Sequence, residues 1–211
     1  MRRILVSFDC YGTLVDWSYT LSSFVEYVAG KGAAESFFEC ERRTLLGLRG
    51  YKPYSSILEE CLRKVMEERG RVFSPRYGRG VVAAFAHSPP FPDTVPGLAL
   101  LREKGFRIAI VSNTERRLID ITIAGFRDLV DYVVTAEDTG YYKPDARALE
   151  KAFEAMGVGL GDVVHVSAYP FYDLEPASRL GVRTVMIDRY GYDWSPSVRT
   201  VEELAMLLER L

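Results

Sequence analysis

The sequence contains no glutamine and a single asparagine, Asn113, among its 211 residues. Arginine outnumbers lysine by 21 to 6. Depletion of heat-labile amides is typical of proteins from thermophiles, whereas an excess of arginine over lysine is found only in some of their families. We therefore expect a thermophilic source. The retention of Asn113 then raises the question of what this one amide does.

Cysteine is scarce, and long apolar runs are missing. Cys10, Cys40 and Cys61 are odd in number and show no C-x-x-C spacing, so we expect three reduced, mostly buried thiols and neither disulfides nor a zinc site. The first apolar run stops at Asp9, which is too short for the core of a signal peptide. No stretch reaches the roughly 18 apolar residues that a membrane helix needs. These absences predict a cytoplasmic protein without a membrane partner.

An excess of positive charge is also missing. The chain has 27 basic and 29 acidic residues, which gives a net charge of −2 and argues against nucleic acid as a partner. A content of 48% hydrophobic and 27% charged residues is typical of a globular protein and excludes a disordered chain. Without a basic stripe, the 13 tyrosines and 11 phenylalanines are expected in the core and in pocket walls.

Short apolar runs rich in β-branched residues alternate with helical patterns along most of the chain. Such runs are typical of strands covered on both faces, as in a parallel sheet. The alternation predicts an α/β fold with a doubly wound, Rossmann-like parallel sheet. The five expected strands are Arg3 to Phe8, Arg107 to Val111, Tyr132 to Thr135, Val163 to Val166 and Arg183 to Ile187.

The segment 17–88 interrupts this alternation with amphipathic helical stretches and no convincing strand. It ends in the proline-rich sequence HSPPFPD, whose prolines favour an extended connection. We interpret 17–88 as an inserted helical cap, and 1–16 with 89–211 as the α/β core.

Polar side chains follow four of the expected strands. Ligands of a doubly wound sheet bind beyond the carboxyl ends of the strands, so these side chains are expected to meet at one site. The candidates are Asp9, Ser112, Asn113, Lys143, Ser167 and Asp173.

The sequence around these residues resembles that of the haloacid dehalogenase superfamily of hydrolases. The shared features are the D-x-x-G-T sequence from Asp9 to Thr13, Ser112 after the second strand, Lys143 followed by proline, and Asp173 after the fourth strand. The four motifs occur in the family's order, and the helical insertion occupies the place of the family's cap. The resemblance covers nearly the whole chain and is greatest to the type II 2-haloacid dehalogenase-like members.

Two positions separate the dehalogenases from the phosphatases of this superfamily. The phosphatases carry a second Asp two residues after the nucleophile, which protonates the leaving alkoxide, and this chain has Tyr11 there. A departing halide needs no proton. Ala168 stands where the phosphatases have a further acidic ligand, and Mg²⁺ prefers several oxygen ligands. The resemblance therefore implies a hydrolase of carbon–halogen bonds without a cofactor, and Mg²⁺ only if the protein is a phosphatase.

The resemblance also implies a mechanism. Asp9 displaces halide from a small 2-haloacid and forms an aspartyl ester, which a water positioned by Asp173 hydrolyses. Lys143 keeps Asp9 ionised and aimed. Thr13 and Ser112 donate hydrogen bonds to Asp9 or to the substrate carboxylate, and Ser167 orients Lys143 or Asp173.

Further positions match the substrate and halide contacts of the dehalogenases. Backbone amides of Cys10, Tyr11 and Gly12 are expected to receive the substrate carboxylate, with Gly12 allowing close approach. Asn113 matches the halide-binding Asn. Its partner is an Arg of the cap, for which Arg42 and Arg43 are the candidates; Arg42 is preferred because it shares a helix face with apolar neighbours. Tyr172 matches an aromatic pocket wall.

The chain also departs from the dehalogenases, because Leu149 stands in place of a family Tyr and the fourth motif lacks the family Asn. Two other functions are therefore kept. One is a magnesium-dependent phosphohydrolase that holds the metal through Asp9 and Asp173. The other is an inactive relative that serves as a binding module. The resemblance is compatible with a homodimer.

Overall fold

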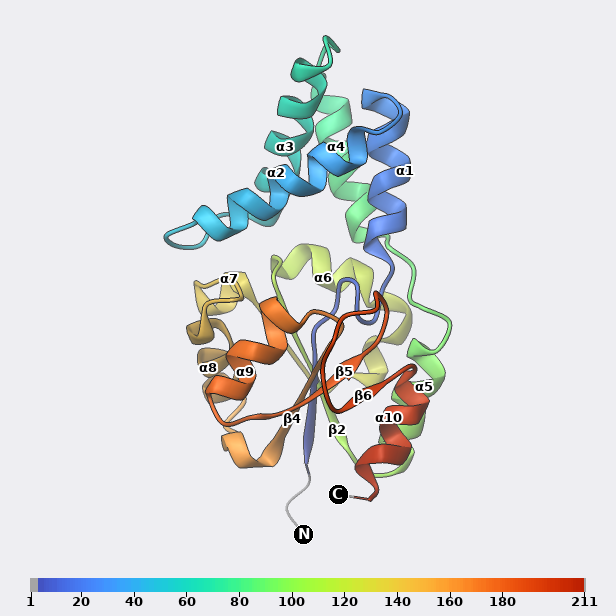
Figure 1. The fold of residues 1–211 in the computed structure, drawn as a ribbon, viewed down its shortest axis with the longest axis vertical. Helices are drawn as coiled ribbons and strands as arrows, with labels where there is room; N and C mark the ends of the chain where they lie inside the picture. Colours follow the sequence, from blue (N-terminus) through green and yellow to red (C-terminus); the bar gives the residue numbers. More distant parts are fainter. Residues whose placement is uncertain (1–3, 211) are drawn as a thin grey trace.

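The computed structural model describes residues 4–210, which form a parallel six-stranded sheet in the order β3-β2-β1-β4-β5-β6. The doubly wound α/β fold is thereby confirmed (Figure 1). The predicted first strand included Arg3, which lies outside the described residues. The strands are β1 (Leu5–Phe8), β2 (Arg107–Ser112), β3 (Tyr132–Thr135), β4 (Val163–Ser167), β5 (Arg183–Ile187) and β6 (Ser197–Val198). The sequence did not predict β6, because a strand of two residues carries no periodicity.

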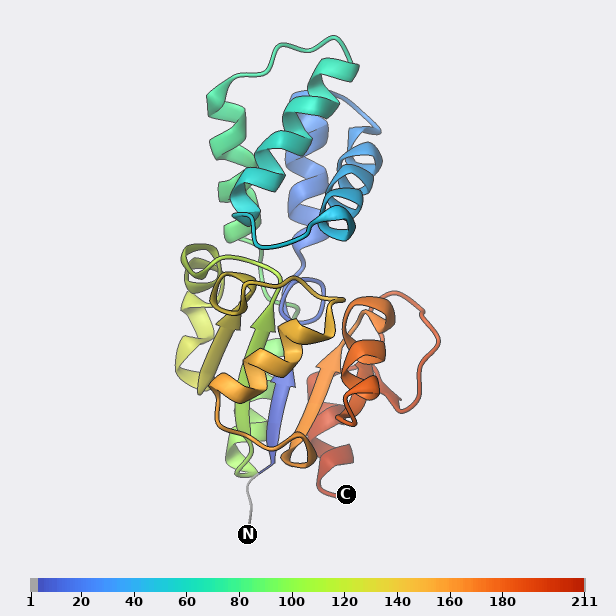
Figure 2. The same cartoon turned by 90° about the vertical axis from the view of Figure 1, so that its left-hand side faces the viewer.

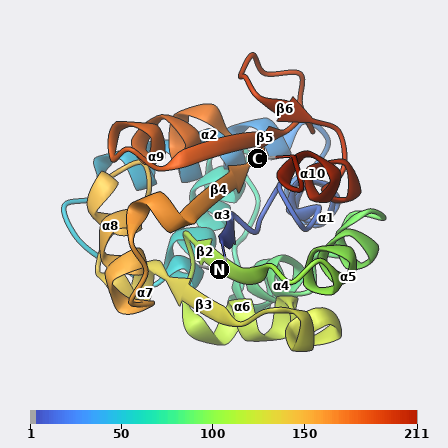
Figure 3. The same cartoon turned by 90° about the horizontal axis from the view of Figure 1, so that it is seen from below.

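Helices cover both faces of the sheet, as the apolar strands require (Figure 3). Helices α8 (Ala146–Ala155) and α9 (Glu175–Arg179) lie on one face, and α5 (Thr94–Glu103) and α10 (Val201–Leu208) lie on the other. Neighbouring residues of a strand point to opposite faces. Leu5 of β1 accordingly joins one apolar core, whereas Val6 joins the other.

Short helices complete the core in the connections between the strands. Asp173 lies in one of them, the π-helix η3, which follows β4 directly. These helices are α6 (Arg116–Thr122), α7 (Ala136–Thr139), η1 (Ala124–Leu129), η2 (Leu160–Asp162) and η3 (Pro170–Leu174).

Four helices form a bundle above the carboxyl ends of the strands (Figures 1 and 2). They are α1 (Trp17–Ala29), α2 (Ala33–Gly47), α3 (Tyr54–Glu68) and α4 (Pro75–Ala86). Local sequence explains two of their starts: Asp16 accepts a hydrogen bond at the beginning of α1, and Ser74 does so before Pro75 at the beginning of α4. All four lie within the predicted cap, while its boundaries at 17 and 88 stay a prediction.

The cap contains a disulfide between Cys40 of α2 and Cys61 of α3. The expectation of three reduced thiols was therefore wrong for this pair; Cys10 is free and buried. The two cysteines stand 21 residues apart in sequence and come together because α2 packs against α3, which brings their Cα atoms to 5.6 Å. Spacing along the chain does not reveal such a contact.

No helix of residues 4–210 is both long and apolar enough to cross a membrane.

Candidate active site

The centre of the site is a buried ammonium group between two buried carboxylates. Asp9 follows β1, Lys143 lies in the loop after α7, and Asp173 lies in η3. Lys143 Nζ is 2.9 Å from Asp9 Oδ1 and 2.6 Å from Asp173 Oδ1. It also donates to the carbonyl oxygen of Val111 at 2.8 Å. The four chain segments that the motifs predicted to meet do meet here.

The protonation of this cluster follows from burial and mutual charge. Burial alone lowers the pKa of Lys143, but Asp173 and Asp9 raise it above its usual value. Burial raises the pKa of Asp9, and Lys143 opposes this shift. Burial also raises the pKa of Asp173, but Lys143 and a hydrogen bond from His165 outweigh this effect and hold the pKa below its usual value. The arrangement favours a charged Lys143 beside an ionised Asp173 at neutral pH, and the same ammonium group lowers the pKa of Asp9 against the effect of burial.

Thr13 holds the second oxygen of the Asp9 carboxylate. Its hydroxyl donates to Asp9 Oδ2 at 2.9 Å and accepts from the amide of Ala168 at 3.0 Å. Gly12 precedes it with φ +86°, a conformation that favours glycine, and a Cβ at this position would overlap the Tyr169 ring. The loop after β1 is therefore packed closely against the loop after β4, which fixes Thr13 and through it Asp9 Oδ2, while Lys143 holds Oδ1.

The sequence predicted that Ser167 orients Lys143 or Asp173, but its side chain bonds to neither of them. Its hydroxyl accepts from the amide of Tyr169 at 3.0 Å and lies 3.5 Å from the Thr13 hydroxyl, so it stabilises the loop after its own strand. Within residues 4–210, the orienting contact to Asp173 comes instead from His165, whose Nε2 is 3.0 Å from Asp173 Oδ1. The sequence did not single out His165, because a histidine inside an apolar strand pattern looks like a core residue.

Ser112 and Asn113 end β2 at the same edge of the sheet. The Ser112 hydroxyl is buried and makes no hydrogen bond to any described residue. The Asn113 side chain forms two hydrogen bonds with the backbone of Lys143, one donated and one accepted. Both residues line the cavity between this edge of the sheet and the cap. Ser112 thus offers its hydroxyl to a molecule in the cavity, and Asn113 anchors the loop that carries Lys143.

A cavity of about 100 Å³ opens between the carboxyl ends of the strands and the cap. Tyr11 and Tyr172 contribute walls, as the sequence predicted for the substrate site. The walls that sequence reasoning missed are aromatic or come from the cap: Trp17, Glu41, Leu45, Tyr54, Phe85 and Tyr169. A cavity of this size with mainly apolar walls fits a small molecule.

Hydrogen bonds between the cap and the core fasten the cap over this cavity. Tyr142, next to Lys143, donates to the carbonyl oxygen of Lys52 at 2.6 Å. Ser55 of α3 donates to the carboxylate of Glu115 at 2.9 Å. The segment from Lys52 to Ser55 thus ties the start of α3 to the core on the side of Lys143.

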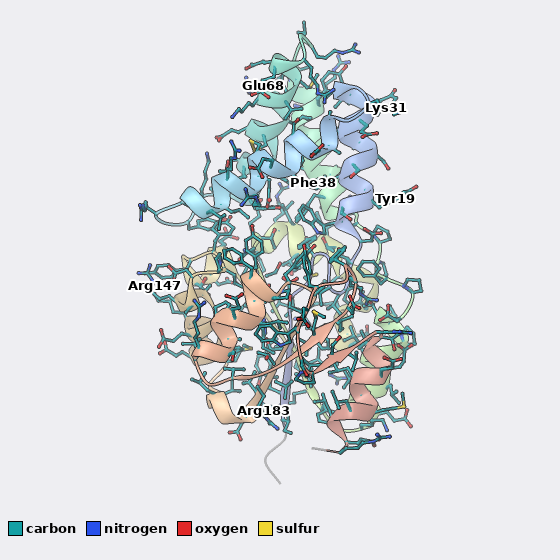
Figure 4. The ribbon with its side chains drawn as sticks, viewed as in Figure 1. Tyr19, Lys31, Phe38, Glu68, Arg147 and Arg183 are labelled. Carbon is teal, nitrogen blue, oxygen red and sulfur yellow. A yellow bond between two sulfur atoms is a disulfide. The ribbon has the colours of Figure 1, made fainter. Side chains whose placement is uncertain are left out.

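Neither Arg42 nor Arg43 is among the walls of the cavity, where the sequence predicted a cap arginine for the halide. Both are exposed and pair with Glu39, with Arg42 Nε 2.8 Å from Glu39 Oε2. Arg42 also lines the adjoining pocket at the mouth of the cavity, together with Tyr169 and Tyr172. Successive side chains of a helix point about 100° apart, and the α2 side chains that line the cavity are those of Glu41 and Leu45. Phe38, on the same helix, packs edge-on against Trp17 of α1 (Figure 4).

Of the three backbone amides that the sequence predicted for the substrate carboxylate, the structure shows that of Gly12 bonded within the loop after Asp9. The Cys10 side chain is fully buried, and burial raises the pKa of its thiol well above the usual value. Its carbonyl oxygen accepts hydrogen bonds from the following turn, and the Gly12 amide already donates to the carbonyl of Val15 at 2.8 Å. Tyr11 lines the cavity with its ring, while its hydroxyl is bonded to Thr122 at 2.6 Å.

The residues present do not fit a magnesium ion. The carboxylates that would hold it, Asp9 and Asp173, are bridged by Lys143, and Asp173 Oδ1 also contacts His165. Ala168 supplies no side-chain oxygen. Among residues 4–210, no three His, Cys, Asp or Glu side chains are arranged to hold a metal ion.

Comparison with known proteins places the chain in a family. An (S)-2-haloacid dehalogenase of Pseudomonas sp. (strain YL) is 29% identical over 94% of this chain and 93% of its own length. A phosphatase of Mycobacterium tuberculosis is 29% identical over 75% of this chain and 72% of its own. The L-2-haloacid dehalogenase structure from Xanthobacter autotrophicus superposes with a TM-score of 0.86 at 21% identity, covering 98% of both chains, so its fold is shared.

A family model described as haloacid dehalogenase-like hydrolase matches residues 5–181, which include all four motifs and the whole cap. This chain belongs to the haloacid dehalogenase-like hydrolase family.

Proposed function

We propose that the protein removes halide from a small 2-haloacid by hydrolysis, without a cofactor. The observation that carries this proposal is the pairing of Asp9 with Lys143 and Thr13 at the floor of a small, largely apolar cavity. The relatives named 2-haloacid dehalogenases support it.

In the first step, a carboxylate oxygen of Asp9 attacks C2 of the substrate. The C2–halogen bond breaks, and the halide leaves with the bonding electrons. Lys143 and Thr13 hold the two oxygens of Asp9, so the nucleophile is aimed before the substrate arrives. The buried Ser112 hydroxyl, which bonds to none of the described residues, is available to the substrate carboxylate. The product of this step is an ester between Asp9 and C2.

In the second step, water attacks the carbonyl carbon of this ester. Asp173 lines the cavity, and within residues 4–210 both contacts of its carboxylate, to Lys143 and His165, use Oδ1. Its Oδ2 is therefore the oxygen proposed to orient the water and take its proton. The tetrahedral intermediate then collapses: the alkoxide oxygen on C2 takes the proton back from Asp173 and leaves as a 2-hydroxyacid, and Asp9 loses the remaining water proton to solvent and becomes a carboxylate again. The configuration at C2 is inverted once, in the first step.

The phosphatase relative makes phosphate ester hydrolysis the second candidate. That reaction needs an acid for the leaving alkoxide near Asp9. The Tyr11 hydroxyl at the expected position is bonded to Thr122, and burial raises its pKa well above the usual value. This geometry favours a leaving group that departs without a proton.

A paired assay tests the proposal. We expect halide release from 2-chloropropionate by the wild type, loss of this activity in Asp9→Asn, and no phosphate release from an aryl phosphate with Mg²⁺. Phosphate release alone would support the second candidate. Absence of both activities over a broad panel of substrates would favour an inactive relative that acts as a binding module.

Isotope labelling tests the ester. With enzyme in excess over 2-chloropropionate in ¹⁸O-water, the first turnover is expected to place the label in the Asp9 carboxylate and to give unlabelled 2-hydroxyacid. Label in the product of that first turnover would show that water attacks C2 directly.

We further propose a thermophilic source, a cytoplasmic location and a homodimeric state. The amide-poor composition supports the first, and intracellular proteins of hyperthermophiles are known to carry disulfides such as Cys40–Cys61. A melting temperature in the ordinary mesophile range would contradict the thermophilic source. Fractionation of the source cells tests the location, and light scattering in solution tests the dimer.

A further inference from the structure

Glu41 is a carboxyl group in the wall of the catalytic cavity to which the mechanism above gives no role. It lies on α2, is 7% exposed and lines both the cavity and the adjoining aromatic pocket at its mouth. Within residues 4–210, Tyr54 is its one hydrogen-bond partner, donating to Oε1 at 2.8 Å. The second oxygen of the carboxyl group is therefore available to a bound molecule.

The cavity has more acidic than basic groups. Asp9, Asp173 and Glu41 line it, and of the described residues Lys143 is the one cationic side chain among its walls. Lys143 is already bonded to both aspartates. Because Lys143 offsets only one carboxylate, ionisation of Glu41 would make the cavity more negative and would strengthen its repulsion of the carboxylate of a 2-haloacid. A neutral Glu41 would instead offer an O–H donor.

We infer that Glu41 binds the substrate as a neutral carboxylic acid and donates a hydrogen bond to the substrate carboxylate from the cap side. This inference rests on the proposed function and makes Glu41 a specificity-determining residue for small monocarboxylates. Glu41 would contact the anion inside the cavity, whose walls include neither Arg42, which lies in the adjoining pocket at its mouth, nor Arg43. The Ser112 hydroxyl would contact the same carboxylate from the core side.

The neutral form follows from the surroundings of Glu41. Burial raises its pKa to about 7, and the hydrogen bond from Tyr54 offsets this only in part. Burial also raises the pKa of Tyr54 and of Tyr142 well above the usual value, and that of Tyr172 to about 12, so these tyrosines do not titrate near neutral pH. Titratable groups line the two pockets with Glu41 or interact with it electrostatically: Tyr54 from α3, Tyr172 and Asp173 from η3, Tyr169 from the loop after β4, Tyr142 and Lys143 from the loop after α7, Asp9 and Tyr11 from the end of β1, Arg42 from α2, and Tyr190 and Tyr192 from the loop after β5.

Binding of propionate, measured by calorimetry between pH 6 and pH 8, tests the inference without any turnover. With the Glu41 pKa near 7, we expect the Kd of the wild type to rise about tenfold over this range. In Glu41→Gln, whose amide donates at every pH, the Kd is expected to stay constant and close to the wild-type value at pH 6. Glu41→Leu lacks a donor, so its Kd is expected to be about tenfold higher at pH 6.

Two controls accompany this series. Glu39→Gln removes a carboxylate two residues earlier, on the outer side of α2, and is expected to keep the pH dependence of the wild type. Propionamide has no carboxylate, so its Kd is expected to be independent of pH. A pH-independent Kd for propionate in the wild type, or the same pH dependence in Glu41→Gln, would overturn the inference.

The assay also separates this inference from the proposed function. Propionate does not react, so absence of halide release would contradict dehalogenation and leave the binding result intact. Conversely, if 2-chloropropionate is dehalogenated but its KM has the same pH profile in the wild type and in Glu41→Gln, the role of Glu41 is wrong and the proposed function stands.

Discussion

Asn113 and Lys143 are joined by two hydrogen bonds through the backbone of Lys143. The Asn113 amide Nδ2 donates to the Lys143 carbonyl oxygen at 2.9 Å, and the Lys143 N–H donates to Asn113 Oδ1 at 2.8 Å. One carboxamide thus satisfies a donor and an acceptor of the same residue, which an aspartate, having no donor, cannot do. The single amide side chain of the sequence therefore fixes the loop that carries the central cation.

Replacing Asn113 tests whether it positions Lys143 or binds halide. We expect Asn113→Ala to lower kcat because the ammonium is no longer held against Asp9, and to lower stability by about 1–3 kcal/mol for the lost hydrogen bonds. Rates measured with chloro-, bromo- and iodopropionate separate the two roles. A positioning role slows all three substrates by a similar factor. A factor that differs strongly between halides would identify Asn113 as a halide ligand.

Removing the charge of Lys143 leaves two facing carboxylates buried without a cation. We expect Lys143→Met to abolish halide release and to destabilise the fold by about 3–5 kcal/mol, measured by urea unfolding at pH 7. Adding Asp9→Asn to this variant is expected to restore part of the stability but no activity, because one uncompensated charge is gone. Equal stability of the single and double variants would show that the Asp9 charge is screened in another way.

The disulfide of the cap supports the helix that carries Glu41. Cys40 precedes Glu41 on α2, and its bond to Cys61 closes a loop of 21 residues. Such a loop is worth about 3 kcal/mol, or about 6–12 °C of melting temperature for a chain of this length. We expect this loss in the variant with both Cys40→Ser and Cys61→Ser. A reductant should lower the melting temperature of the wild type and leave that of the double variant unchanged; no effect on the wild type would contradict the bond.

The sequence predicted the strands and the central cluster because both have local signatures. Apolar runs identified five strands, and each motif residue stands at the end of a strand or in the loop beyond it, so the sheet alone brings Asp9, Lys143 and Asp173 together. Which side of α2 faces the cavity depends instead on how the cap packs on the core. A rotation of about 100° about the helix axis decides between Arg42 and Glu41, and no local pattern records it.

The same limit explains the remaining differences. The Cys40–Cys61 bond depends on the packing of two helices, and the contact of His165 with Asp173 depends on the turn of the π-helix after β4. Alternation along β4 places His165 and Ser167 on the same side of the strand, two residues apart. That relation could have identified His165 as a neighbour of the site, since Ser167 was already a candidate.

The raised pKa of Glu41 also predicts that the stability of the protein depends on pH. Its pKa is about 7 in the folded protein against a model value of 4.5, so between these values the folded state holds a proton that the unfolded state has lost. The contribution of Glu41 to the free energy of unfolding is therefore greatest below pH 4.5, falls as the pH rises to about 7, and then levels off. The difference between the two ends is about 3 kcal/mol.

Glu41→Gln removes this titration while it keeps a polar group beside Tyr54. We expect the variant to gain stability relative to the wild type as the pH rises from about 5 to 7, by up to about 3 kcal/mol, and to keep this gain at pH 8. Urea unfolding of both proteins at pH 5, 6, 7 and 8 measures the difference, and Glu39→Gln serves as the control because Glu39 is on the outer side of α2. A stability difference that stays constant from pH 5 to pH 8 would show that Glu41 ionises in the folded protein as it does in the unfolded chain.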